Sequence, residues 1–117
     1  MQIETALLQN VLVVKPLEKR LDAASATQFK GLLMDWINEG RLKIVLDLTY
    51  IDFMDSSGLA VLLTTLKTIG ADGALAVCNP QPAVTSLFEV TRVKRVLTFY
   101  PSVDAAVAAL GEVSSEQ

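Results

Sequence analysis

Histidine is absent from this 117-residue chain, and Cys78 is its single cysteine. A chain without imidazole or a second thiol cannot build a Ser-His-Asp or Cys-His catalytic site, a histidine-ligated zinc site or an internal disulfide. An excess of positive charge is missing as well, since ten Lys and Arg against thirteen Asp and Glu give a formal net charge of −3. The chain therefore offers no basic field to a phosphate backbone. We therefore exclude these sites and predict that the protein has no nucleic-acid partner.

Long apolar runs and a basic leader are also missing. No stretch approaches the roughly 18 apolar residues of a membrane span, and residues 1–4 (MQIE) do not open a basic segment followed by an apolar one. These absences predict a cytoplasmic protein that does not insert into a membrane. With 51% apolar residues, the chain can form one hydrophobic core. We predict a single domain over residues 1–111 and a flexible tail over residues 112–117.

The apolar pattern alternates between two kinds of segment. Short β-branched or apolar segments predict strands at residues 3–8, 11–14, 43–48, 74–78 and 96–99. Apolar residues at helical spacing predict four helices, from Ser25 to Gly40, from residue 55 to Gly70, after Pro82, and from Ser102 to Gly111. Ser25 and Gln28 fit a capping box at the start of the first helix. The first two strands predict a hairpin, and the later alternation predicts parallel strands with segment 43–48 in the centre. The predicted fold is therefore α/β, with a mixed, mainly parallel sheet and about four helices.

Polar side chains concentrate in the segment that follows the predicted central strand. Asp47, Asp52, Asp55, Ser56 and Ser57 lie in or next to this segment. In parallel α/β sheets, functional groups gather at the carboxyl ends of the strands, where loops lead into helices. This segment is therefore the candidate site.

Several interpretations of this segment remain open from the residues alone. Asp55, Ser56 or Ser57 can cap the following helix. Asp47, Asp52 and Asp55 could instead hold Mg²⁺ through their oxygens. Ser56 at a helix N-terminus could carry a phosphate, since the helix dipole favours an added negative charge there. A phosphoacceptor aspartate of the response-regulator kind is excluded, because the acidic pair and the lysine that it requires are missing.

Three motifs in order resemble the STAS domain, specifically the bacterial anti-sigma factor antagonists. The first is Leu21-Asp22-Ala23 ahead of the first predicted helix. The second is FMDSSGL at residues 53–59, and the third is VCNP at residues 77–80 together with PAV at 82–84 and LF at 87–88. The resemblance covers nearly the whole chain and implies a single STAS-like domain.

In that family, the serine after the aspartate is phosphorylated by a partner that is both an anti-sigma factor and an ATP-dependent serine kinase. The resemblance implies that Ser56 is this serine. The unphosphorylated protein would bind the anti-sigma factor and release a sigma factor for transcription, and a serine phosphatase would restore this form. The implied partner-binding residues are Asp22, Met54, Asp55, Ser56, Ser57 and Gly58. No catalytic residue, metal or cofactor is implied.

We also predict specific roles for Gly58, for Ser57 and for the charged residues 18–20. Gly58 has no side chain, so we expect it to leave room for a partner beside the backbone. The Ser57 hydroxyl is expected to help cap the helix. Many relatives carry Gly-Glu just before Leu-Asp, whereas this chain has EKR at residues 18–20. The added positive charge predicts an acidic patch on the partner.

Two other functions stay open. The same fold could serve as a scaffold subunit of a stress-sensing complex or as the partner of a membrane transporter ATPase. A small metal-dependent enzyme using Asp47, Asp52, Asp55 and Ser56 is the alternative of another class, although no general base with a perturbed environment is evident. The sequence does not fix the oligomeric state.

Overall fold

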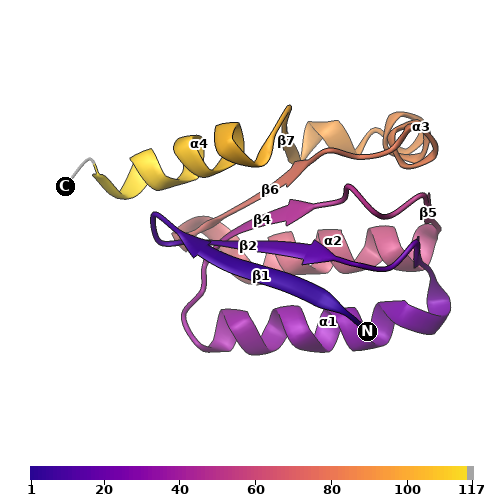
Figure 1. The fold of residues 1–117 in the computed structure, drawn as a ribbon, viewed down its shortest axis with the longest axis horizontal. Helices are drawn as coiled ribbons and strands as arrows, with labels where there is room; N and C mark the ends of the chain where they lie inside the picture. The colour runs from indigo at the N-terminus through magenta and orange to yellow at the C-terminus, as the bar shows by residue number, and fades with distance from the viewer. Residues whose placement is uncertain (116–117) are drawn as a thin grey trace.

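Seven strands make up the sheets of the computed structural model, which describes residues 1–115 (Figure 1). They are β1 (Ile3–Leu8), β2 (Val11–Pro16), β3 (Arg20–Leu21), β4 (Lys43–Asp47), β5 (Phe53–Met54), β6 (Ala74–Cys78) and β7 (Thr98–Tyr100). The main sheet has the order β1-β2-β4-β6-β7, in which β1 is antiparallel to β2 and the other neighbours are parallel. The predicted α/β fold with a mixed, mainly parallel sheet is confirmed, and β4 is its central strand.

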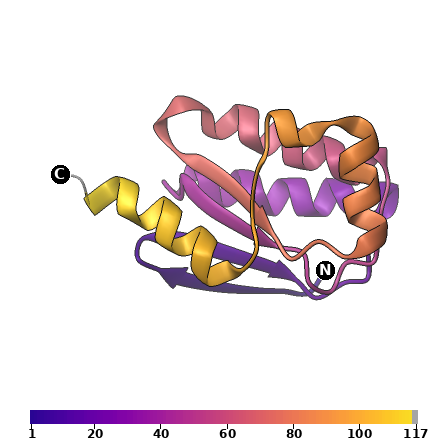
Figure 2. The same cartoon turned by 90° about the horizontal axis from the view of Figure 1, so that it is seen from above.

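Helices cover both faces of this sheet. They are α1 (Ala23–Asn38), α2 (Ser56–Ile69), α3 (Pro82–Thr91) and α4 (Val103–Ser115), with short 3₁₀ turns η1 (Gly70–Asp72) and η2 (Val93–Arg95). Helices α1 and α2 pack on one face and α4 on the other (Figures 1 and 2). Within residues 1–115, none of the helices combines the length and the hydrophobicity of a membrane span.

The two-sided cover explains why the central strands are apolar along most of their length. In β4, Ile44 and Leu46 belong to the apolar cluster that includes α1 and α2, whereas Val45 belongs to the cluster under α4. All three side chains are fully buried. Since alternate residues of a strand point to opposite faces, a strand covered on both sides has no position for a solvated side chain. The polar residues of the candidate site therefore lie at its carboxyl end, where Asp47 is the last residue of β4, and in the segment that leads to α2.

Some predicted boundaries are wrong. Strand β7 begins at Thr98 rather than at residue 96, because the N–H groups of Val96 and Leu97 donate to the Val93 carbonyl at 2.9 and 2.8 Å and continue the η2 turn. Helix α4 continues through Gly111, where a Cβ would lie 2.7 Å from the side-chain oxygen of Gln9. The glycine therefore permits close packing rather than ending the helix. Residues 116–117 of the predicted tail lie outside the described residues.

Candidate functional site

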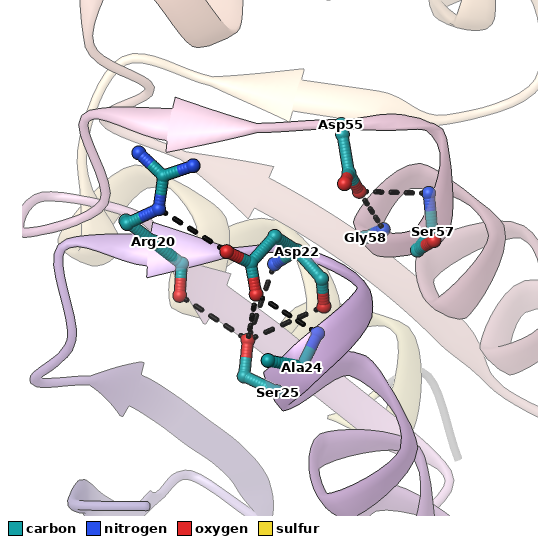
Figure 3. A network of polar contacts seen from close by, with 7 residues as sticks. All are labelled: Arg20, Asp22, Ala24, Ser25, Asp55, Ser57 and Gly58. Carbon is teal, nitrogen blue, oxygen red and sulfur yellow. Dashed lines mark hydrogen bonds and ion pairs between the residues drawn. The ribbon is translucent and has the colours of Figure 1, made fainter.

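Asp55 sets the N-terminus of α2. Its backbone is extended, and its carboxylate oxygen Oδ1 accepts hydrogen bonds from the backbone N–H groups of Ser57 at 2.9 Å and Gly58 at 3.2 Å (Figure 3). These N–H groups have no partner inside the helix, so the side chain stabilises the first turn. The predicted cap at this position is confirmed for Asp55. The expected role of the Ser57 hydroxyl is wrong, since Ser57 contributes its backbone N–H to the cap.

Ser56 is the first residue of α2, and its side chain is exposed. Asp55 caps the helix, and the Ser56 hydroxyl has no hydrogen-bond partner among the residues that the structure describes. Ser57 is half-buried and lines a groove of about 260 Å³ between α1 and α2. The other lining residues are Ala26, Thr27, Lys30, Ala60, Val61 and Thr64. Sequence reasoning missed this groove, because its residues come from two helices that are distant along the chain.

A two-stranded parallel sheet holds the segment before α2 in place. Strand β3 pairs with β5, with Arg20 opposite Phe53 and Leu21 opposite Met54. The Leu21 carbonyl accepts a further bond from the N–H of Asp55 at 3.4 Å. This small sheet was not predicted, since two residues per strand are too few to produce a detectable alternation.

The small sheet places two helix N-termini in equivalent positions. Leu21 and Met54 pair across it, and the next residue in each chain segment, Asp22 or Asp55, is the N-cap of α1 or α2 (Figure 3). The predicted capping pair of Ser25 with Gln28 is therefore wrong. Asp22 is the cap, and Ser25 lies at the third helical position, where its hydroxyl accepts the N–H of Asp22 at 3.1 Å.

Arg20 contacts both Asp22 at the start of α1 and Phe53 of β5. Its Nε donates to Asp22 Oδ2 at 3.1 Å, and its guanidinium carbon lies 4.0 Å from the centre of the Phe53 ring. The hydrogen bond from Arg20 is the largest cause that lowers the pKa of Asp22 from its ordinary value of 3.8. Backbone hydrogen bonds to the carboxylate act in the same direction. Arg20 and Asp22 are two residues apart on an extended segment, a spacing that places both side chains on one face.

Gly58 does not leave room for a partner, because the chain itself fills that space. The residue is buried, and a Cβ at this position would lie 2.5 Å from the Leu21 carbonyl oxygen and 2.8 Å from Met54 Cγ. Met54 is itself only 6% exposed. Among the predicted partner-binding residues, Ser56 is exposed and Asp22, Asp55 and Ser57 are half-buried. Met54 and Gly58 are buried beneath this surface.

The three aspartates of the suggested magnesium site have separate roles. Buried Asp47 accepts hydrogen bonds from Thr49 and from the side-chain amide of Asn79, the latter at 3.2 Å. Asp52 pairs with Lys19 at 3.8 Å, and Asp55 caps α2. No group of three or more acidic or cysteine side chains within the described part of the chain could hold a metal ion.

Comparisons with known proteins match this chain to the STAS domain and to anti-sigma factor antagonists. The sequence profile of the STAS domain matches residues 2–106. The anti-sigma F factor antagonist of Paenibacillus polymyxa is 32% identical over 116 residues, covering 97% of this chain and 98% of the relative.

Two solved structures share the fold. An anti-sigma factor antagonist from Mycobacterium paratuberculosis superposes with a TM-score of 0.85 at 22% identity, covering 93% of this chain and 92% of that chain. The phosphorylated form of the Bacillus cell fate determinant SpoIIAA superposes with a TM-score of 0.69 at 21% identity, covering 92% and 96%.

Proposed function

This chain belongs to the STAS domain family, and from that premise we propose that it is an anti-sigma factor antagonist controlled by reversible phosphorylation of Ser56. Its partners are an anti-sigma factor with serine kinase activity and a serine phosphatase that acts on the phosphorylated form. It works in the cytoplasm by binding, without catalytic activity, cofactor or metal of its own. Release of a sigma factor links this binding to transcription.

One observation carries the proposal: Ser56 is exposed while its neighbour Asp55 performs the structural task of capping α2. A serine that capped the helix would have to give up its hydrogen bond before accepting a phosphate. The Ser56 hydroxyl is exposed to solvent and to a kinase without such a loss. The helix N-terminus also favours the added negative charge, so phosphorylation should leave the fold intact.

The same position explains how a phosphate would end partner binding. Phosphorylation adds a charge of about −1.5 to −2 and a bulky tetrahedral group. The carboxylate of Asp55 lies on the preceding residue, and Asp22 caps the neighbouring helix across the small sheet. A partner surface complementary to the bare hydroxyl would then meet both steric overlap and a concentrated negative charge.

The partner surface that we propose extends from Ser56 into the groove beside Ser57. Lys30 lines this groove and supplies positive charge, while Ala60 presents a small side chain at its wall. Lys19 makes one contact with Asp52 at 3.8 Å and keeps 84% of its side chain exposed, whereas Arg20 is engaged with both Asp22 and Phe53. The acidic patch expected on the partner would therefore face Lys19 and Lys30 more than Arg20. Asp22 and Asp55 contribute at the rim, and Met54 and Gly58 act by holding this surface in shape.

The test compares serine variants for binding and stability. The partner is first captured on the immobilised, unmodified protein from its native cells, identified by mass spectrometry and then purified. Ser56→Asp should weaken binding at least roughly tenfold, while its melting temperature stays within about 4 °C of the wild type. Ser56→Ala should bind like the wild type. Ser86→Asp, the same change on an exposed serine of α3, is the matched control and should bind normally.

Two results would contradict the proposal. The first is a Ser56→Asp protein that binds its partner as tightly as the wild type. The second is capture of a transporter ATPase or of a large multi-subunit particle in place of an anti-sigma factor. That second result would leave the fold assignment intact and support the other functions of the family fold.

A further inference from the structure

Strand β1 leaves one edge of the main sheet open. It pairs with β2 on one side and with no other strand among residues 1–115. In the view of Figure 2 it is the outermost element along one side of the molecule. Two of its large apolar side chains are exposed, Leu7 by 50% and Leu8 by 44%. The edge therefore offers both apolar surface and backbone hydrogen-bonding groups.

The hairpin register determines which backbone groups point outward. In an antiparallel pair, residues alternate between positions that bond the neighbouring strand and positions whose N–H and C=O point away. The N–H of Leu17 donates to the carbonyl of Gln2 at 2.9 Å, so even-numbered residues of this segment face β2. The N–H and C=O groups of Ile3, Thr5 and Leu7 consequently point to the open edge.

Apart from the charge of Glu4, nothing in β1 protects this edge against pairing. Proteins commonly guard an edge strand with lysine, proline, a bulge or a very short length. Strand β1 has six residues in unbroken register with β2, contains neither lysine nor proline, and carries Glu4 as its one charged residue. Such an edge is a template for another strand.

We propose that two copies of this chain pair through β1 in antiparallel orientation, with Thr5 opposite Thr5 of the second copy. In this register each outward-facing residue meets an outward-facing residue, since Ile3 lies opposite Leu7 on both sides of the centre. Each such pair exchanges two backbone hydrogen bonds. The Ile3–Leu7 pairs also cover part of the apolar surface that β1 exposes.

Charge excludes one neighbouring register, and the hairpin turn excludes the other. A shift by two residues in one direction places Glu4 opposite Glu4 of the second copy, and like charges in that position are destabilising. A shift in the other direction places Ile3 opposite Gln9, which belongs to the hairpin turn with a positive φ of 51°. With Thr5 in the centre, Glu4 lies opposite Ala6, and the two five-stranded sheets become one continuous sheet.

The interface is small, so the dimer should depend on concentration. Pairing of two short strands buries much less than the roughly 1,200 Å² of a standard interface. The proposal is independent of the function proposed above, since it uses neither Ser56 nor the groove between α1 and α2.

The first experiment is sedimentation velocity of the full chain over a range of concentrations. Thr5→Pro removes an outward N–H from each copy, and edge strands accept proline where the N–H faces solvent. We expect the dissociation constant of the Thr5→Pro dimer to be at least roughly tenfold higher than that of the wild type, because both copies lose a backbone hydrogen bond. Val90→Lys, at an 81% exposed position of α3, should leave the dimer unchanged. A wild type that stays monomeric, or a dimer that Thr5→Pro does not weaken, overturns the proposal.

A second experiment keeps the proposal testable if Thr5→Pro fails to fold. Paired Cα atoms at bonded positions lie about 5.5 Å apart, within disulfide range, so oxidised Thr5→Cys should form a cross-linked dimer. Leu7→Cys lies on the same strand but faces Ile3 of the second copy, so it should cross-link with Ile3→Cys and not with itself. The natural Cys78 is buried and does not compete. Equal self-cross-linking of the two variants would contradict the register, and absence of cross-linking in Thr5→Cys would contradict the interface.

Discussion

Gly58 of α2 passes so close to Leu21 of β3 that a Cβ on the glycine would lie 2.5 Å from the leucine carbonyl oxygen. The same carbonyl accepts the N–H of Asp55 at 3.4 Å. The first turn of α2 is therefore positioned by a direct backbone contact with β3. In our account, this contact determines where Ser56 is presented to a partner.

Gly58→Ala should lower the free energy of unfolding by about 1 to 3 kcal/mol, since an inserted methyl group must displace backbone. It should also weaken partner binding although the Ser56 hydroxyl is unchanged. Urea denaturation and binding to the captured partner measure the two effects. The control is Gly31→Ala in α1, where a Cβ meets nothing within 4 Å and should stabilise the helix by about 0.5 to 1 kcal/mol. Equal stability of the two variants would show that the close contact does not constrain α2.

Asp55→Ala should cost about 1 kcal/mol of stability, because the N–H groups of Ser57 and Gly58 lose their acceptor. Asp55→Asn keeps an oxygen acceptor at the same position and should retain most of that stability. Thermal denaturation of both variants measures the difference. If the alanine and asparagine variants melt together well below the wild type, the carboxylate charge rather than the cap is what stabilises the site.

Local sequence signals were sufficient where one short segment decides the structure. Asp55 ahead of the apolar stripe of α2 is such a signal, and the cap follows from it. The apolar run of β4 likewise predicts a buried central strand. By contrast, the cap of α1 depends on pairing between β3 and β5, two-residue strands that are distant along the chain. The sequence pattern of Ser25 and Gln28 therefore suggested a start three residues too late.

Acid should destabilise the protein partly through Asp22. Its pKa is lowered in the folded protein, so its contribution to stability is present above the ordinary value of 3.8 and is lost as the pH falls towards the lowered value. Asp22→Asn should therefore show a shallower loss of stability between about pH 5 and pH 3 than the wild type. Arg20→Gln removes the largest cause of the shift and should behave similarly. Parallel slopes for wild type and Asp22→Asn in urea denaturation would contradict this role.

Cys78 should be unreactive in the folded protein. Burial, together with the negative charge of Asp47, raises the pKa of its thiol from 9.0 to about 12. A disulfide reagent near neutral pH should modify it after denaturation and not before. Since the raised pKa favours the neutral thiol, its contribution to stability is present below pH 9.0 and lost as the pH rises towards about 12. Rapid modification of the native protein would show that the thiol is accessible.

As with the fold, the sequence predicted those parts of the candidate site that one continuous segment determines. Ser56 and Asp55 lie in one continuous segment, and their places at the start of α2 follow from it. The burial of Gly58 could not be predicted, because it depends on the approach of β3. The groove that contains Lys30 likewise requires the packing of α1 against α2. Contacts between distant segments are thus what the sequence alone left undetermined.

The central claim is that Ser56 is the phosphorylated residue that controls partner binding. Peptide mass spectrometry of the protein isolated from its native cells, both free and bound to its partner, tests this directly. Our account predicts phosphate on Ser56 in the free fraction, unmodified Ser56 in the fraction bound to the anti-sigma factor, and no phosphate on the half-buried Ser57. Phosphate on Ser57 instead, or equal phosphorylation of Ser56 in both fractions, would contradict it.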